Sequence, residues 1–196
     1  MKCKILLLGL AAGAVSCGGD AKTELFNGRD LTGWVCVTAG GPAAAEVFTV
    51  QDGCIRVAGQ PFGFLRTAEQ YGDYRLHAEW RWIGKPSNSG LFQRIQECQL
   101  ESGNAGDLLG LGGATMAGVE SPEGGVPVKK RVGGASEKPA GEWNEAEVIC
   151  KGDRITVYVN GVLQNECSGV NTRGYIALQS EGGPLEFRNI YLTEVE

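Results

Sequence analysis

Residues 71–100 read YGDYRLHAEWRWIGKPSNSGLFQRIQECQL, and this stretch decides the fold class. Polar and apolar residues alternate over two of its segments, 74–82 and 91–100, and a loop rich in Gly, Pro, Ser and Asn joins them. Alternation over this length is typical of half-buried β-strands. We therefore expect two strands that each turn one face toward a hydrophobic core.

The outward faces of these two strands are polar. The first strand is expected to bury Leu76, Ala78, Trp80 and Trp82 and to expose Arg75, His77, Glu79 and Arg81. The second strand carries Gln93, Arg94, Glu97 and Gln99. Two interpretations fit this pattern: the polar groups line a cleft on a sheet, or they form the solvated outer face of a sandwich.

Length and composition favour a single all-β domain. A chain of 196 residues is long enough for one sizeable core and short for two domains. It holds 31 glycines and little helical periodicity after residue 25, which favours many short strands joined by turns. Loss of Lys2 and Lys4 with a leader lowers the 18 basic residues to 16 against 23 acidic ones, a net charge near −7. This charge disfavours nucleic acid as a partner.

The first residues have the pattern of a targeting signal. Lys2 and Lys4 precede an apolar run, and residues 14–17, AVSC, resemble a bacterial lipobox, whose cysteine becomes the lipidated N-terminus. An ordinary cleaved leader is the alternative.

This pattern gives the expected domain boundaries and location. We expect a lipoprotein signal peptide over residues 1–17, ending at the lipidated Cys17, then a tether over 18–23 and one domain over 24–196. The protein is then exported and lipid-anchored, at the periplasmic or outer-membrane face of a Gram-negative bacterium.

Five cysteines remain beyond the leader, and an odd number cannot all pair within one chain. They are Cys36, Cys54, Cys98, Cys150 and Cys167. None has CxxC spacing and His77 is the only histidine, so a Cys/His zinc site is disfavoured.

Two strong hairpin signals, Gly152-Asp153 and Asn160-Gly161, organise the last third of the chain. They place Cys150 opposite Ile155 on the core face and Cys167 opposite Arg154 on the other face. A disulfide between Cys150 and Cys167 is then out of reach, and we expect Cys150 to be a buried free thiol.

Residues 101–142 interrupt the strand pattern with many glycines. Such a long irregular insertion forms either loops at the rim of a cleft or a mobile surface excursion. The basic run Lys129-Lys130-Arg131 within it is expected to be a solvated patch. Near the end of the chain, the alternation slips close to Asn189, which predicts a β-bulge.

Five stretches together resemble the 3-keto-disaccharide hydrolase domain family, in that family's order over residues 25–194. They are LFNGRDLTGW, YGDYRLHAEWRW, NSGLFQR, GEWNEAEVICKGDRITVYVNG and IALQSEGGPLEFRNIYL. The resemblance implies a concanavalin-like β-jelly-roll sandwich of two antiparallel sheets, with a sugar cleft on the concave one. It also implies action on glycosides already oxidised to a ketone at C3.

The chemistry of such a substrate defines what a site must supply. The C3 ketone acidifies the proton on C2, and loss of that proton lets the glycosidic bond at C1 break by β-elimination. Water can then add to complete a net hydrolysis. The site needs a general base for C2–H and a cation or hydrogen-bond donor for the enolate oxygen.

The resemblance carries over to particular residues. The family's Glu-x-Gln strand matches Glu97 and Gln99, its preceding Arg matches Arg94, its late Leu-Gln matches Gln179, and a recurring acid matches Glu79. Glu97 is the candidate base, Arg94 or a divalent metal ion the enolate stabiliser, and Glu79 a further catalytic acid or base.

Further residues are candidates for substrate binding. They are Gln93, Gln99, Gln179, Trp143 and Glu181. Many relatives carry histidines where this chain has residues 103–107 and Ser180-Glu181, so neither a metal nor a cofactor is assigned here.

Two other functions compete with cleavage of 3-keto-glycosides. A carbohydrate-binding module on the same jelly roll needs aromatic platforms, for which Trp80, Trp82 and Trp143 are candidates, although tryptophans at this spacing also fit the core. A retaining glycosidase needs two carboxylates flanking the bond. The chain lacks the compact Glu-x-Asp-x-x-Glu pattern of one jelly-roll group of that kind, so we rank it last.

The lipobox generates a test. Replacing Cys17 by Ala removes the acceptor of the lipid chains, so the protein should remain uncleaved or become soluble, because two or three acyl chains anchor firmly. Detergent phase partitioning of the parent and the variant measures this. Equal partitioning of both proteins into the detergent phase would contradict the lipid anchor.

Overall fold

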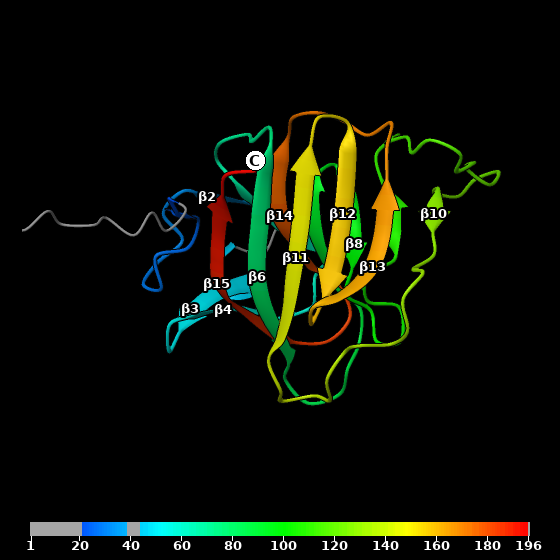
Figure 1. The fold of residues 1–196 in the computed structure, drawn as a ribbon. Helices are drawn as coiled ribbons and strands as arrows, with labels where there is room; N and C mark the ends of the chain where they lie inside the picture. The colour runs from blue at the N-terminus through cyan, green and yellow to red at the C-terminus, as the bar shows by residue number, and fades with distance from the viewer. Residues whose placement is uncertain (1–20, 39–43, 196) are drawn as a thin grey trace, which may run out of the picture.

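The computed structural model describes residues 21–38 and 44–195, which form two antiparallel β-sheets packed face to face (Figure 1). The predicted sandwich of two antiparallel sheets is thus confirmed. The predicted signal peptide with Cys17 lies outside the described residues.

The first sheet has eight strands. Their order in space is β13 (Val162–Cys167), β12 (Arg154–Val159), β11 (Asn144–Lys151), β6 (Tyr74–Trp82), β15 (Leu185–Thr193), β4 (Cys54–Val57) and β3 (Phe48–Gln51), with β1 (Thr23–Glu24) paired to β15.

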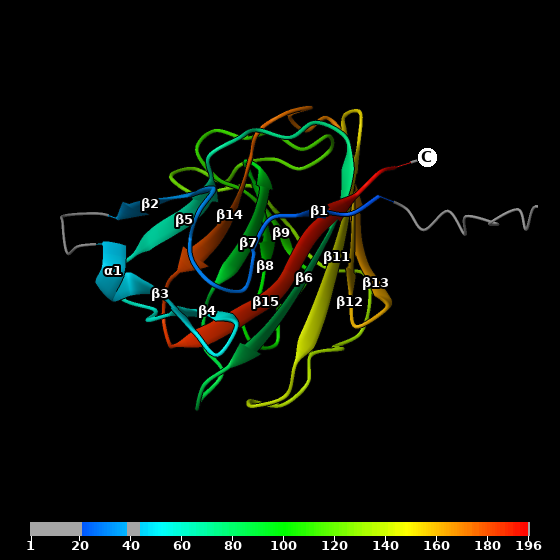
Figure 2. The same cartoon turned by 90° about the vertical axis from the view of Figure 1, so that its left-hand side faces the viewer.

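The second sheet has seven strands. Their order is β10 (Val128–Lys129), β9 (Leu108–Gly110), β8 (Gln96–Gln99), β7 (Gly90–Arg94), β14 (Tyr175–Ser180), β5 (Gly63–Thr67) and β2 (Trp34–Thr38). Figure 2 shows β15, β6 and β11 in one layer and β5, β14 and β7 in the other. The described residues hold one helix, α1 (Ala44–Val47), and none long and apolar enough to cross a bilayer.

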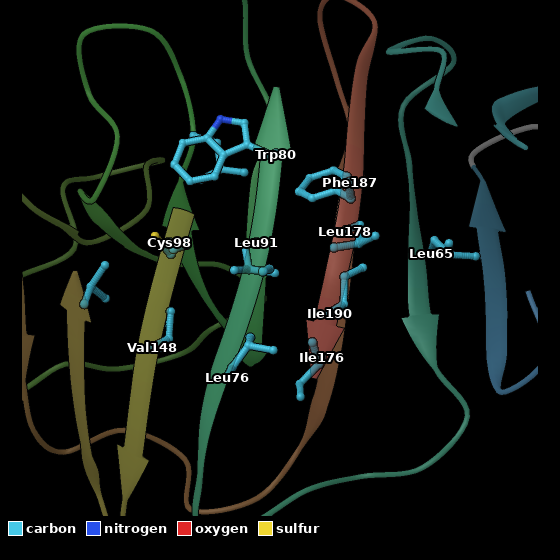
Figure 3. Packing of buried hydrophobic residues seen from close by; sticks show 14 of the residues in the cluster. Leu65, Leu76, Trp80, Leu91, Cys98, Val148, Ile176, Leu178, Phe187 and Ile190 are labelled. Atoms are coloured by element: carbon cyan, nitrogen blue, oxygen red, sulfur yellow. The ribbon is translucent and has the colours of Figure 1, made fainter. Parts of the chain in front are cut away.

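Strand β6 has the bounds that the alternation predicts, and it lies between β11 and β15 in the first sheet. Its apolar side chains point into the space between the sheets, where Leu76 and Trp80 pack with Leu91 and Leu178 of the second sheet (Figure 3). Trp80 and Trp82 are both buried in this core. Neither is therefore a sugar platform, and the interpretation of these two tryptophans as core residues is confirmed.

The expected second strand, 91–100, is wrong in two respects. It is a hairpin of β7 and β8, with Gln93 opposite Gln96, and it belongs to the sheet that β6 does not join. The chain reverses at Arg94 and Ile95, where Arg94 takes the left-handed conformation with φ 66°. No Gly, Asn or Asp marks this turn, so the sequence carries no local signal for it.

Buried contacts of the Arg94 side chain hold this turn in place. Its Nη1 donates to the carbonyl oxygens of Gly152 at 2.6 Å and Asn171 at 2.9 Å, and its Nη2 donates to the carbonyl of Gly72 at 2.7 Å. Nη2 also lies 3.2 Å from Oδ1 of Asp73. The guanidinium thus joins the tip of the β7–β8 hairpin to the start of β6 and to the β11–β12 turn of the other sheet.

The last third of the chain pairs almost as predicted. Cys150 lies opposite Ile155 and Val148 opposite Val157, and all four side chains are buried. The placement of Cys167 is wrong: a register shift in the β12–β13 pair puts it opposite Ile155, on the buried face. It still lies two strands away from Cys150, and the five cysteines of the described residues are free thiols.

Two other expectations concern irregular segments. The bulge near Asn189 is confirmed, because the β15–β6 register shifts between Arg188 and Tyr191 and Asn189 has a φ of 49°. The tether boundary is one or two residues too late. Lys22 places its ammonium 3.8 Å from the ring centre of Tyr191, and Thr23 begins β1.

Ion pairs fix much of the 101–142 insertion. The buried Asp107 accepts hydrogen bonds from Nζ of Lys130 and from the backbone N–H of Arg131, both at 2.8 Å. The Arg131 guanidinium lies 3.2 Å from Glu137, whose other oxygen accepts the N–H groups of Gly103 and Ala105. The basic run is therefore largely paired with acids of the same insertion, which the solvated-patch interpretation did not anticipate.

The Arg94 contacts generate a test of stability. Arg94→Ala removes a fully buried guanidinium and its hydrogen bonds to three carbonyls, so it should lower the free energy of unfolding by about 3–5 kcal/mol. Arg75→Ala is the matched control, because Arg75 also pairs with an acid, Glu147, but is exposed, and its loss should cost less than about 1 kcal/mol. Urea unfolding of both variants measures the difference. Equal losses would contradict the bridging role of Arg94.

Candidate active site

Glu97 lies on the outer face of the second sheet, the face turned away from the first sheet. Its neighbour Cys98 points into the core. Because side chains alternate along a strand, Glu97 and Gln99 point to the outer face. Glu97 is directly opposite Phe92 on β7. Its side chain lies across Gly90, so closely that a Cβ atom at that position would collide with the carboxylate. The glycine therefore provides the space that the carboxylate occupies.

Two glutamines flank this carboxylate, as predicted. Gln99 lies opposite Gly90 on one side, and the β14–β7 ladder brings Gln179 beside Gly90 on the other. The Gln99 Oε1 atom accepts the backbone N–H groups of Leu100 and Glu101, both at 2.8 Å. This orientation leaves the amide NH₂ group of Gln99 free to donate to a ligand.

Two buried oxygen atoms at this place have no hydrogen-bond partner among the described residues. They are Oε1 of Glu97 and Oε1 of Gln179. Glu97 and Gln179 are each only 2% exposed. A buried polar atom without a partner is costly, and such atoms concentrate at ligand sites.

The environment of Glu97 keeps its carboxyl protonated well above its ordinary range. Burial raises its pKa to about 8, and the negative charge of Glu181 at the end of β14 adds to the effect. A carboxyl group whose pKa lies near neutrality is suited to accept or deliver a proton during a reaction.

Two predicted site residues of the β7–β8 hairpin do not reach this place. Because the chain reverses at Arg94, its guanidinium is enclosed by the carbonyls described above and has no exposed surface left for a substrate. Gln93 lies beside Ile176 and shares the core-facing side of β7 with Leu91, so its side chain is buried between the sheets. Their assignments as enolate stabiliser and substrate ligand are wrong.

Glu79 and Trp143 lie on the outer face of the other sheet. They line a hollow of about 540 Å³ with Lys138, Asn144, Glu145 and Asn160. Burial by itself raises the pKa of Glu79, but hydrogen bonds from Asn189 and Arg188 outweigh it and hold that pKa below its ordinary value. Trp143 is covered by the guanidinium groups of Arg188 and Arg81, 3.9 and 4.6 Å from its ring centre. Glu79 therefore belongs to an ion-pair network on the first sheet, and Trp143 packs against the arginines of that network, on the other sheet from Glu97.

The apolar part of the site was not predicted from the sequence. A groove of about 440 Å³ runs over the outer face of the second sheet, beginning at Phe92 and continuing along β14, β5 and β2. Its aromatic lining consists of Phe62, Phe64, Phe92 and Tyr175. Phe64 on β5 and Phe92 on β7 come together only because β14 lies between these strands in the sheet order. From the 101–142 insertion, Leu111 and Gly112 reach its rim, which favours the cleft-rim interpretation for that part.

Two groups of side chains have the chemistry to hold a metal ion. The oxygens of Glu97 and Gln179, which flank Gly90, are of the kind that Ca²⁺ and Mg²⁺ prefer. On the first sheet, the ligand atoms of His77, Glu145 and Glu147 lie within 4.8 Å of one another. That second group is on the wrong sheet to act together with Glu97.

Comparisons with known proteins agree with this architecture. The chain is 24% identical to the 3-keto-disaccharide hydrolase of Bacteroides thetaiotaomicron, over 87% of this chain and 77% of that protein. A solved structure from Parabacteroides distasonis, provisionally described as a glycosyl hydrolase, superposes with a TM-score of 0.66 at 19% identity, covering 89% of this chain and 94% of that one. The carbohydrate-binding module CBM66 of Bacillus subtilis superposes at 0.60 with 10% identity, covering 83% and 96%.

These solved structures share the fold of this chain, and a sequence profile of a protein family also matches it. The profile of the 3-keto-alpha-glucoside-1,2-lyase-like domain matches residues 21–193, which is nearly the whole described chain. The resemblance drawn from the five sequence stretches is confirmed, and this protein belongs to the 3-keto-alpha-glucoside-1,2-lyase-like domain family.

Proposed function

We propose that this protein cleaves 3-keto-glycosides, with Glu97 as the general base. The observation that carries the proposal is a buried carboxyl with a pKa of about 8, one oxygen unpartnered, on the outer face of the second sheet. Support comes from the family and from the relative described as a 3-keto-disaccharide hydrolase.

The reaction follows from the acidity of C2–H. Glu97, as carboxylate, takes the C2 proton, and the electron pair of the C–H bond delocalises onto the C3 carbonyl oxygen as an enolate. The enolate then expels the C1 oxygen, forming the C1–C2 double bond and leaving a 3-keto-glycal and the aglycone, which takes up a proton. Addition of water across C1–C2 returns the free 3-keto sugar and restores the carboxylate.

The enolate oxygen needs a donor or cation other than Arg94. The NH₂ group of Gln99 is available, because its oxygen is already used by two backbone N–H groups. An oxygen-preferring divalent ion held by Glu97 and Gln179 would supply the same stabilisation with a full charge. Assays with and without a chelator distinguish the two.

A carbohydrate-binding module without chemistry is the second candidate. Its support is the shared fold of the Bacillus subtilis module, which at 10% identity concerns architecture alone. A binding module has no need for a buried carboxyl that stays unpaired at a cost in stability. We therefore favour catalysis. Export with a lipid anchor at Cys17 remains part of the proposal, since the targeting signal lies outside the described residues.

Replacing the base is the first test of catalysis. Glu97→Gln keeps the shape of the side chain and removes its ability to accept the proton, so turnover of a 3-keto-glucoside should fall by at least about a hundredfold. Glu79→Gln is the matched control on the other sheet and should stay within about twofold of the parent. Aglycone release by folded protein measures both, with the unoxidised glucoside as a substrate control. A Glu97→Gln protein as active as the Glu79→Gln protein would refute the assignment.

The pH dependence is the second test. A base must be deprotonated in the free enzyme, so kcat/KM should rise with pH and level off above about 8, following the pKa of Glu97. Glu181→Gln removes a repelling charge, which should lower that pKa and move the rising limb toward acid pH. Rate profiles between about pH 5 and 9.5 measure the shift. A rising limb that stays in place would show that Glu181 does not act on the titrating group.

The same pKa shift predicts how stability depends on pH. The folded protein keeps a proton that the unfolded chain releases near the ordinary glutamate pKa of 4.5, so stability is lost as the pH rises from 4.5 and the loss is complete above about 8. Glu97→Gln should therefore be more stable than the parent at alkaline pH and similar at acid pH. Thermal unfolding of both proteins across this pH range measures the difference.

A further inference from the structure

The groove on the outer face of the second sheet is almost entirely apolar. Its lining includes the rings of Phe62, Phe64, Phe92 and Tyr175 and the aliphatic side chains of Val37 and Ile95. Its volume of about 440 Å³ is that of a small-molecule site. Phe62 and Val37 at its outer end are 42% and 47% exposed, which is unusual for side chains of this kind in a domain with a well-filled core.

The groove begins beside Glu97. Phe92 lines the groove and is the direct cross-strand partner of Glu97, so the Cβ atoms of the two residues are about 4.5–5.5 Å apart. From Phe92 the aromatic wall continues outward. The ring centres of Phe92 and Phe64 are 5.0 Å apart and those of Phe64 and Phe62 are 5.1 Å apart, with interplanar angles of 80° and 82°. These three rings form a single edge-to-face row that leads away from Glu97.

The groove offers few hydrogen bonds to a ligand. The Arg66 guanidinium lies 4.0 Å from the ring centre of Tyr175 and donates to the carbonyl of Thr67 at 2.9 Å. The Arg94 guanidinium is enclosed elsewhere. A second sugar placed here would lose the water around several hydroxyl groups and find few partners in return, which is costly. An aromatic ring would gain by burial against the phenylalanine row.

Resting on the proposed function, we propose that this groove is the aglycone subsite and that it takes an aromatic aglycone, so that the preferred substrates are 3-keto-glycosides of phenols. The sugar lies over Glu97, Gln99 and Gln179, and the phenolic ring lies along Phe92 and Phe64. The leaving-group chemistry of phenols also favours an aromatic aglycone. A phenol has a pKa of about 10, so the phenolate leaves C1 with little help from an acid. Apart from Glu181, the described residues next to Glu97 supply no second carboxyl whose charge acts on it.

The experiment compares two ligands of the same anomeric configuration, phenyl and methyl 3-keto-glucoside, and adds a 3-keto-disaccharide. Dissociation constants are measured by calorimetry with the Glu97→Gln protein, and kcat/KM with the parent. The parent should prefer the phenyl glucoside over the methyl glucoside and over the disaccharide. Cleavage of the methyl glucoside tests the proposed function, and the preference for phenyl over methyl tests the aglycone subsite.

Substitution at the outer end of the groove tests whether the preference for the phenyl glucoside arises there. Phe62→Ser removes one wall of the groove and should reduce the phenyl-over-methyl preference in binding about tenfold, as for other losses of apolar contact in a pocket. Val162→Ser is the matched control, because Val162 is also 42% exposed but lies on β13 of the first sheet. It should leave the preference unchanged.

Three outcomes would overturn the inference. They are equal affinity of the Glu97→Gln protein for the phenyl and methyl glucosides, a preference that Phe62→Ser does not reduce, and tighter binding of the disaccharide than of the phenyl glucoside. The last outcome would make the groove a sugar subsite. If no 3-keto-glycoside is cleaved but the phenyl preference in binding is present and sensitive to Phe62, the proposed function fails while the aromatic subsite stands.

Discussion

The buried guanidinium of Arg94 is the interaction on which the site depends. It stands at a two-residue chain reversal, in a backbone conformation that residues other than glycine seldom adopt, and its donors bond three carbonyls from three separate segments. A charge without exposed surface must be satisfied by acceptors, and these acceptors belong partly to the opposite sheet. The reversal it holds is what turns β8 back along β7. That pairing in turn sets Glu97 opposite Phe92 on the outer face.

The carboxyl group of Glu97 occupies space that a side chain at position 90 would otherwise fill. Gly90 leaves the backbone of β7 bare, and Glu97 lies over it between the two glutamines. This position removes the carboxyl from water without giving it a cation. Burial and the charge of Glu181 then move the pKa of Glu97 toward neutrality. Keeping this carboxyl group buried and unpaired costs stability, and it gives the group a pKa suited to proton transfer near neutral pH.

The two outer faces of the sandwich differ in whether their carboxyl groups have arginine partners. On the first sheet, three carboxylates pair with arginines: Glu79 with Arg188, Glu147 with Arg75, and Glu186 with Arg81 and Arg56. On the second sheet Glu97 has no cationic partner among the described residues. Instead it stands at the end of an aromatic groove. A neutralised acid stabilises a surface, whereas an isolated one beside an apolar hollow is typical of a reacting centre.

The sequence by itself determined the local structure and the chemical character of the chain. Alternation over 74–82 defined β6 and its core face, the Gly152-Asp153 turn fixed the β11–β12 register, and the slip at Asn189 located the bulge. The family resemblance correctly brought together Glu97, Gln99 and Gln179. These features depend on near neighbours in the chain, whose periodicity and turn residues are visible in the sequence.

Only the tertiary structure decided which polar residues share a face. Glu79 and Glu97 lie on similar alternating strands, yet they belong to different sheets, because strand order depends on long-range pairing that no local pattern encodes. The turn at Arg94 carries no turn residue and is held by acceptor groups 21 to 77 positions away, so the sequence predicted one strand where there are two. The aromatic groove likewise exists only because β7, β14, β5 and β2 lie side by side, which brings together residues that the chain keeps apart.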